Sequence, residues 1–210
     1  MTNSLTNTAR VLGAGLRALL ALTLLTGVLY PLVVTGIAQG LFHDQANGSE
    51  IEADGKVAGS SLIGQQGYGL RYFQPRPANG LGQNSVNTRY ELTVSGATNL
   101  AADSKVLLRQ VEEAKAAVVK DNSVPGYAVK PSQVPADAVT SSGSGLDPHI
   151  SPAYAELQVH RVAVKNDLPV RAVEKLVEEH TEGRTLGFIG EPRVNVLRLN
   201  LALKDLAAKK

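Results

Sequence analysis

The chain of 210 residues contains no cysteine and no tryptophan, and its other aromatic rings are few, at six tyrosines and three phenylalanines. The lack of cysteine is compatible with an oxidising compartment without assigning one. The scarcity of aromatic rings argues against a base-stacking surface for nucleic acids. Also missing are a G-x-x-x-x-G-K-[ST] loop, an H-E-x-x-H pair and a G-x-S-x-G elbow, so the sequence marks of P-loop proteins, zinc proteases and α/β-hydrolases are absent.

Acidic residues are absent from the first 43 positions, where the basic residues are Arg10 and Arg17 alone. The whole chain has 21 Lys and Arg against 19 Asp and Glu, a formal net charge of +2. The rest of the chain therefore carries 19 charges of each sign, and the excess belongs to the N-terminal segment. A balanced domain lacks the basic footprint of a nucleic-acid binder, so we expect no nucleic-acid partner.

One long hydrophobic run, ALLALTLLTGVLYPLVVTGIA, extends over 18–38 without a charge. As a helix its 21 residues would measure about 31 Å, close to the hydrocarbon thickness of a bilayer. We expect residues 1–40 to form a cytoplasmic N-terminus and a membrane anchor that spans about 18–38. Residues 41–210 are then long enough for one extracytoplasmic domain.

Two other interpretations of this run are open from the sequence. A cleaved secretory signal would have a basic start, but also a shorter apolar core and a better cleavage site than Gly36-Ile37-Ala38. A buried helix of a soluble domain seldom has so long an uncharged stretch. For an anchor, Arg10 and Arg17 lie on the N-terminal side and no Lys or Arg follows before Lys56, which predicts an N-terminus inside and a domain outside.

Small residues recur at four-residue spacing along the anchor, at Thr23, Gly27, Pro31 and Thr35. Such a row allows another helix to approach closely and predicts a docking face for other membrane helices. The alternative is a lipid-facing anchor with incidental threonines. Pro31 cannot donate a backbone hydrogen bond, so the carbonyl of Gly27 loses its helical partner and a bend is expected there.

The predicted fold class is α+β, with the single N-terminal transmembrane helix followed by a mixed, mainly helical domain with a small sheet. A short strand pair is expected within Val57–Gln66. Apolar spacing, with proline and serine at helix starts, predicts helices over Asn99–Asp121, Pro152–Asn166, Val170–Thr181 and a C-terminal segment from Pro192. The alternating leucines from Leu197 to Leu203 would also suit a strand in that last segment.

Ser144, Asp147 and His149 lie close together in the string SGSGLDPHISP and suggest a nucleophilic triad. One short loop rarely brings three such side chains onto one reacting atom, so a turn-forming loop is the expected structure. The four histidines form no close ligand pair, so no metal site is predicted. We expect no catalytic residue, and a membrane-anchored hydrolase that uses Ser144 or Ser142 is kept as an alternative, beside a periplasmic ligand-binding domain.

Several strings, in order along nearly the whole chain, resemble the C subunits of Kdp-type potassium-transporting P-type ATPases. These strings are GVLYPL from Gly27, GSSLIGQ from Gly59, YF from Tyr72, RP from Arg76, SGLDPHISP from Ser144 and GEPRVNVL from Gly190. The resemblance implies a non-catalytic accessory subunit with one span of the bacterial inner membrane. Its implied partners are a potassium-channel-like subunit and an ATP-hydrolysing pump subunit, with ATP and K⁺ acting on the complex rather than bound directly by this chain.

The resemblance also implies the role of a catalytic chaperone, a subunit that is needed for the complex and raises the pump subunit's affinity for ATP. The resemblance makes seven residues candidates for partner contact: Arg76, Ser144, Asp147, His149, Gln158, Arg161 and Asn195. A transport-ATPase-like signature matches Val94–Asn99 poorly, because Ala97 and Thr98 depart from it. If the domain lies outside, this stretch is across the membrane from ATP, so an effect on ATP affinity must pass through helix packing. We expect the domain to cover the potassium entrance.

Overall fold

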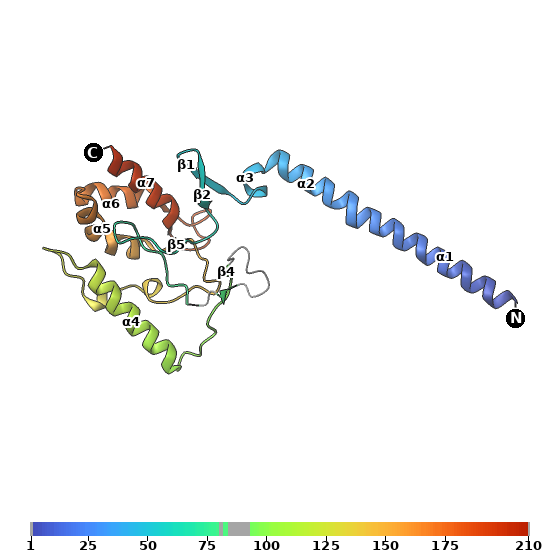
Figure 1. The fold of residues 1–210 in the computed structure, drawn as a ribbon, viewed down its shortest axis with the longest axis horizontal. Helices are drawn as coiled ribbons and strands as arrows, with labels where there is room; N and C mark the ends of the chain where they lie inside the picture. Colours follow the sequence, from blue (N-terminus) through green and yellow to red (C-terminus); the bar gives the residue numbers. More distant parts are fainter. Residues whose placement is uncertain (1, 80–81, 84–92, 210) are drawn as a thin grey trace. The chain divides into compact units, whose positions relative to one another are not determined.

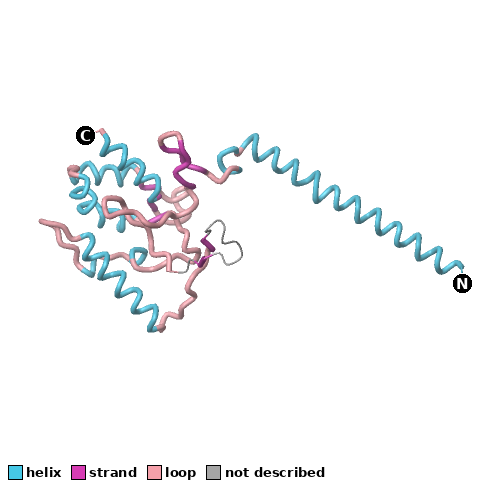
Figure 2. The backbone as a smooth tube through the Cα atoms, viewed as in Figure 1, coloured by secondary structure: helices cyan, strands magenta, loops and turns pink. Residues whose placement is uncertain are grey.

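The computed structural model describes residues 2–79, 82–83 and 93–209, and side chains within 4–79 and 94–209. The chain separates into two compact units, Met1–Ser49 and Glu50–Lys210. Figures 1 and 2 show the backbone of both units. Each is described here by itself.

The first unit consists mainly of one long helix (Figures 1 and 2), which contains a π-helical turn. It consists of α1 (Thr2–Leu24), a π-helical turn (Leu25–Leu29) and α2 (Tyr30–Leu41), and the short α3 (His43–Ala46) follows. In the π turn the Tyr30 N–H donates to the carbonyl of Leu25, five residues back. Pro31 stands in the first turn of α2. A π turn is one way in which a helix absorbs a residue that cannot donate its backbone hydrogen bond, and it lies at the predicted disturbance.

The helical stretch Ser4–Leu41 is long and apolar enough to cross a membrane, since it contains an 18-residue window with a mean hydropathy of 2.1 of which nothing is buried. The helix is longer than the span predicted at about 18–38, because it also includes the residues before that span. Its large side chains are exposed, for example Leu16, Leu20 and Leu32 at 57–65%. The single N-terminal apolar helix of the predicted fold class is confirmed.

The second unit begins with a hairpin of β1 (Glu50–Ala53) and β2 (Lys56–Ser60). Its turn is Asp54-Gly55, with φ of 53° and 70°. The expected strand pair within Val57–Gln66 is therefore wrong, because the partner of β2 lies before it. An Asp-Gly pair supplies the two left-handed residues that a tight hairpin turn requires, and this fixes where the chain reverses. A second two-stranded ladder joins β3 (Gly82–Gln83) to β4 (Thr93–Val94).

Four helices follow: α4 (Lys105–Asn122), α5 (Pro152–Asn166), α6 (Val170–Glu179) and α7 (Val196–Ala208). Two 3₁₀ turns, at Pro131–Gln133 and Ala136–Ala138, lie between α4 and α5. An antiparallel sheet of order β5-β7-β6 combines His149–Ile150, Arg193–Asn195 and Thr181–Glu182. The C-terminal segment thus forms both a strand and a helix, and the mainly helical α+β prediction is confirmed.

The core of the second unit is built around α5, which packs against α4 and α6, with α7 against α6. Val162, Val173 and Val194 are fully buried, and they come from α5, α6 and β7. Tyr154 on α5 is 4% exposed, and Phe73 brings a loop segment into the same core. Burial of these side chains, at about 1.5–3 kcal/mol each for the larger ones, stabilises the packing of the helices on the small sheet.

Candidate functional site

A buried arginine lies at the centre of a polar network inside the second unit. Arg161 on α5 is 0% exposed. Its Nε–H donates to Asn122 Oδ1 at 2.8 Å, and its terminal nitrogens donate to Gln158 Oε1 at 2.6 Å, to the Tyr72 carbonyl at 2.9 Å and to the Leu70 carbonyl. A guanidinium has five N–H donors in a fixed fork, which suits several oxygens around one position.

None of these hydrogen-bond partners is a carboxylate, so the charge of Arg161 is held by neutral oxygen atoms. Burial lowers the pKa of Arg161 to about 10. Among the described residues, every buried side-chain nitrogen and oxygen has a hydrogen-bond partner. Because an unsatisfied buried polar group is costly, this network fixes the loop at 70–74 against α4 and α5.

Side-chain amides hold the same loop at two further points on α5. Gln158 accepts a hydrogen bond from the Gln74 N–H at 2.7 Å and donates to the Gln74 carbonyl at 3.2 Å. Asn166 donates to the Arg71 carbonyl at 2.7 Å, and the Arg71 side chain donates back to its Oδ1 at 3.3 Å. The loop therefore lies against α5 in the manner of an added strand, with amide side chains in place of a neighbouring main chain.

Asn195 joins the string GEPRVNVL, in which it lies, to the string GSSLIGQ that begins at Gly59. Its Nδ2 donates to the Ser61 carbonyl at 2.8 Å, while its Oδ1 caps α7 by accepting from the Arg198 N–H at 3.1 Å. Nearby, the Gly64 N–H donates to the Leu146 carbonyl at 2.7 Å. Three strings that are far apart in the sequence thus meet through hydrogen bonds to main-chain carbonyls.

A partly exposed charged cluster is formed by Arg76, Asp147 and His149. Arg76 Nη1 lies 3.0 Å from Asp147 Oδ2, and His149 Nδ1 lies 3.5 Å from Asp147 Oδ1. Their side chains are 24%, 28% and 28% exposed. Hydrogen bonding from His149, with a smaller effect of Arg76, keeps the pKa of Asp147 below its ordinary value of 3.8. The cluster is therefore a fixed pattern of charge that reaches the surface.

Ser144 is exposed and belongs to a turn rather than to a triad. Its Oγ accepts a hydrogen bond from the Leu146 N–H at 3.1 Å and lies 3.3 Å from Ser142 Oγ. Its carbonyl accepts from the Gly96 N–H and the Ser95 hydroxyl, each at 3.0 Å. Within the part of the chain that the structure describes, no hydrogen bond connects Ser144 to His149. Ser144 and His149 therefore do not form a hydrogen-bonded pair of nucleophile and base.

In the membrane helix, the predicted row of small residues is divided by the π turn. Thr23 precedes it, Gly27 lies within it, and Pro31 and Thr35 follow. A Cβ at Gly27 would lie 3.9 Å from the Thr23 methyl carbon and near no other non-neighbouring atom. Thr23 and Gly27 therefore lie next to each other on the helix surface, and both are small residues.

The seven residues singled out for partner contact do not form one site. Arg76, Asp147 and His149 come together at the surface, whereas Gln158 and Arg161 are completely buried and bind the chain's own atoms. Asn195 is 4% exposed, and Ser144 lies on the neighbouring loop. The network also uses asparagines that were not selected from the sequence: Asn122, Asn166 and Asn200. Among the described residues, no group of three or more His, Asp or Glu is placed to hold a metal ion.

Comparison with known proteins gives one consistent result. The family model described as "KdpC: K+-transporting ATPase, c chain" matches residues 12–205. A "Potassium-transporting ATPase KdpC subunit" of Streptomyces avermitilis is 68% identical, covering 99% of both chains, and the one of Streptomyces coelicolor is 67% identical, covering 99% of this chain and 98% of its own. One of Mycobacterium bovis is 48% identical over 94% of this chain and 99% of its own. The chain belongs to the KdpC family, the accessory rather than the catalytic subunits of potassium-transporting ATPases.

Proposed function

We propose that this chain is a single-pass subunit of the bacterial inner membrane that is needed to assemble the potassium-transporting complex. Its partners are a potassium-channel-like subunit and an ATP-hydrolysing pump subunit. The observation that supports this most is the apolar helix Ser4–Leu41, none of whose apolar window is covered by the chain itself. Together with membership of a pump-subunit family, it favours a helix that is covered by lipid and by other membrane helices.

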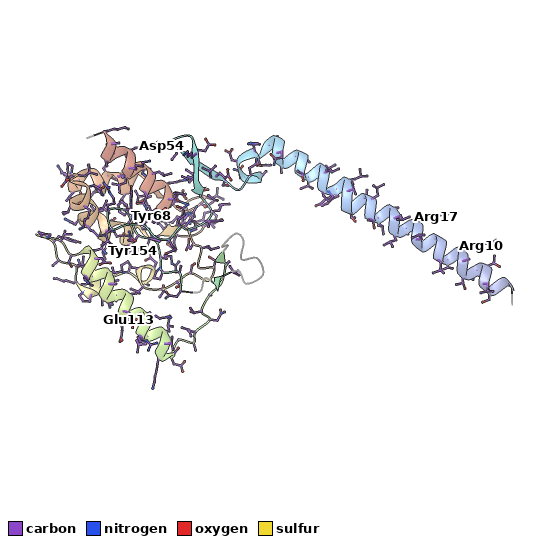
Figure 3. The ribbon with its side chains drawn as sticks, in the orientation of Figure 1. Arg10, Arg17, Asp54, Tyr68, Glu113 and Tyr154 are labelled. Atoms are coloured by element: carbon purple, nitrogen blue, oxygen red, sulfur yellow. The ribbon has the colours of Figure 1, made fainter. Side chains whose placement is uncertain are left out.

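The proposed orientation has the N-terminus in the cytoplasm and residues 41–210 outside. Arg10 and Arg17 both lie on α1 (Figure 3), before the most apolar part of the helix. Since basic flanks are retained in the cytoplasm, the remaining domain would face the periplasm. From there it would cover the entrance of the potassium pathway and support the complex.

For partner contact in the outer domain, we favour the partly exposed cluster of Arg76, Asp147 and His149, with exposed Ser144 on the adjoining loop. Arg76 is fixed by Asp147 and by the Thr140 carbonyl at 3.4 Å, so its charge is presented in one geometry. Fixed side chains lose less conformational freedom on binding than mobile ones. Gln158, Arg161 and Asn195 would act indirectly, by holding the loops that carry these contacts.

An increase of the pump's ATP affinity would have to arise without contact between this domain and the nucleotide, because the two lie on opposite sides of the membrane in this orientation. Such an effect is a coupling free energy, and it requires the subunit to bind two states of the pump differently. The measurement is the KM for ATP of the complete complex, compared with that of the pump subunit purified without this chain. An unchanged KM would contradict the chaperone role while leaving the assembly role intact.

Assembly is tested by mild detergent extraction and quantification of the subunits that co-purify with the chain. Gly27→Leu places a bulky side chain on the proposed docking row and should reduce recovery of partner subunits. Leu24→Ala, in the same helix but off that row, is the control and should have a smaller effect. Equal recovery with both variants would contradict the docking row, and wild-type chain purified alone would contradict assembly itself.

A further inference from the structure

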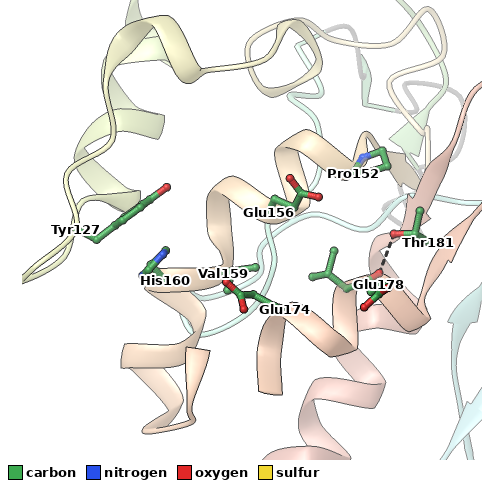
Figure 4. A pocket seen from close by; sticks show the side chains of 9 residues that line it. Tyr127, Pro152, Glu156, Val159, His160, Glu174, Glu178 and Thr181 are labelled. Atoms are coloured by element: carbon green, nitrogen blue, oxygen red, sulfur yellow. Dashed lines mark hydrogen bonds between the residues drawn. The ribbon is translucent and has the colours of Figure 1, made fainter. Parts of the chain in front are cut away.

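The second unit has an open pocket between α5 and α6, closed on one side by the loop after α4 (Figure 4). Its volume is about 680 Å³. Val159 and Val177 line it but are only 2% and 3% exposed, whereas Tyr127 and Pro152 are partly exposed and contribute apolar surface. None of the residues proposed above for partner contact lines this pocket.

Three carboxylates border the pocket, at Glu156 on α5 and at Glu174 and Glu178 on α6 (Figure 4). All three residues are exposed, and none forms an ion pair with a described residue. Other glutamates of this unit do have basic partners, such as Glu179 with Lys175 at 3.6 Å. The lining contains no Lys or Arg. Like charges along a concave surface concentrate a negative potential there.

An aromatic wall adds a second kind of recognition. The rings of Tyr127 and His160 are stacked, with centroids 3.7 Å apart and an interplanar angle of 11°. Figure 4 shows this pair at one end of the pocket and Thr181 at the other. The Thr181 hydroxyl donates a hydrogen bond to the Val177 carbonyl at 2.8 Å. The face of an aromatic ring attracts cations, most often a guanidinium.

The arrangement of the three glutamates and the two stacked rings indicates which class of ligand the pocket would bind. No group of three or more His, Asp or Glu among the described residues is placed to hold a single metal ion. The carboxylates instead surround a space that suits a longer cation with an apolar stem. Lys and Arg side chains have this form, since their methylene groups pack on apolar surface while the charged end reaches polar groups.

We propose that this acidic pocket receives a lysine or arginine side chain from another subunit of the potassium-transporting complex. This inference rests on the assembly role proposed above. The stem would lie in the pocket between α5 and α6, and the charged group would lie among the glutamates or over the Tyr127 and His160 rings. Charge pairs of this kind fix the orientation of a partner and accelerate its association.

The direct test is chemical labelling of carboxylates with a carbodiimide and glycine ethyl ester, followed by peptide mass spectrometry. Full-length chain is labelled alone and within the detergent-purified complex. Labelling of Glu156, Glu174 and Glu178 is expected to fall by roughly tenfold in the complex, as a desolvated charge pair predicts. Equal labelling in an intact complex overturns this inference and leaves the proposed function standing. Failure of the wild-type chain to recover any partner contradicts both.

A variant with all three glutamates changed to Gln tests the energetic role. At low ionic strength, retention of partner subunits should fall by roughly tenfold for Glu156→Gln/Glu174→Gln/Glu178→Gln, and the difference from wild type should shrink as salt is raised. The control, Glu50→Gln/Glu113→Gln/Glu179→Gln, changes the charge by the same amount at exposed positions outside the pocket and should behave as wild type. Equal retention of the two triple variants overturns the proposal. The proposal is also overturned if KCl or spermidine reduces labelling of the three glutamates in the free chain while assembly into the complex does not. That result would assign the pocket to a small cation.

Discussion

Asn200 on α7 pairs with the main chain of Phe73, from which it is separated by 127 residues, as a neighbouring strand would. The Phe73 N–H donates to Asn200 Oδ1 at 2.8 Å, and Asn200 Nδ2 donates to the Phe73 carbonyl at 3.0 Å. Both atoms of the Phe73 main chain that need partners inside the core therefore receive them from one side chain. Gln158 binds the main chain of the next residue, Gln74, in the same way. The loop is therefore held by α7 at Phe73 and by α5 at Gln74.

Replacing this amide should destabilise the second unit. Asn200→Ala leaves the buried N–H and carbonyl of Phe73 without partners, and the free energy of unfolding should fall by about 2–4 kcal/mol. Chemical denaturation of the detergent-solubilised chain, followed by circular dichroism, measures the change. Gln66→Ala is the control, since Gln66 is exposed and its amide lies 3.4 Å from the Arg76 carbonyl. A loss equal to that of the control would contradict this role of Asn200.

Arg161→Lys is expected to be far from conservative. A lysine ammonium cannot reach Asn122, Gln158 and the loop carbonyls together, so the free energy of unfolding should fall by roughly 3 kcal/mol. Amide hydrogen exchange should also become faster at residues 72–74. Arg109→Lys, at a side chain 69% exposed on α4, should change neither quantity. Unaltered exchange in the Arg161 variant would show that the guanidinium does not hold the loop.

Gly64 lies where no side chain fits. A Cβ at this position would be 2.5 Å from the Asp147 carbonyl oxygen and 3.0 Å from its carbonyl carbon, both main-chain atoms. Gly64→Ala should therefore separate the two loops and lower the free energy of unfolding by about 1–3 kcal/mol. Gly69→Ala meets no atom within 4 Å and is the matched control. Thermal unfolding of both variants decides the matter, and equal melting temperatures would reject the steric argument.

The charged cluster predicts a loss of stability in acid. Because His149 and Arg76 lower the pKa of Asp147 below 3.8 in the folded chain, the unfolded chain binds the proton more tightly. The contribution to stability is therefore complete above the ordinary pKa and decreases as the pH falls through the lowered one. Asp147→Asn should flatten the acid side of a stability–pH profile, whereas exposed Asp103→Asn should leave it unchanged. Identical acid slopes would contradict the assignment.

Elements set by neighbouring residues were predicted well. Ser151 caps α5 by accepting a hydrogen bond from the Tyr154 N–H at 3.1 Å, and Pro152 occupies its first turn, as the sequence indicates. The start of α4 was predicted at Asn99 instead of Lys105. Asn99 has a φ of 50°, which cannot continue a helix, and the Ser104 hydroxyl provides the cap five positions later. Apolar spacing alone does not reveal which polar residue ends the loop.

The interior of the candidate site could be predicted only in part. Family resemblance selected Gln158 and Arg161 but not their role, because their partners in the loop at 70–74 lie 84 to 91 residues away along the chain. One signal was available: both residues lie on a helix whose neighbouring positions are apolar and buried, and Asn200 stands between leucines. Polar residues on a buried face need internal partners, although the sequence does not say which main-chain atoms supply them.

The amides of Gln158, Asn166 and Asn200 all bind main-chain atoms of the loop at 71–74. Because these hydrogen bonds are made to main-chain atoms, they depend little on which side chains the loop carries. They do depend on how many residues the loop contains. Inserting or deleting one residue would shift each later carbonyl by about 3.3 Å along an extended chain, more than a hydrogen bond tolerates. Every hydrogen bond beyond the altered point would then be lost together. Apart from Phe73, which is buried in the core, and Arg71, which binds Asn166, the segment should therefore accept substitutions more readily than changes of length.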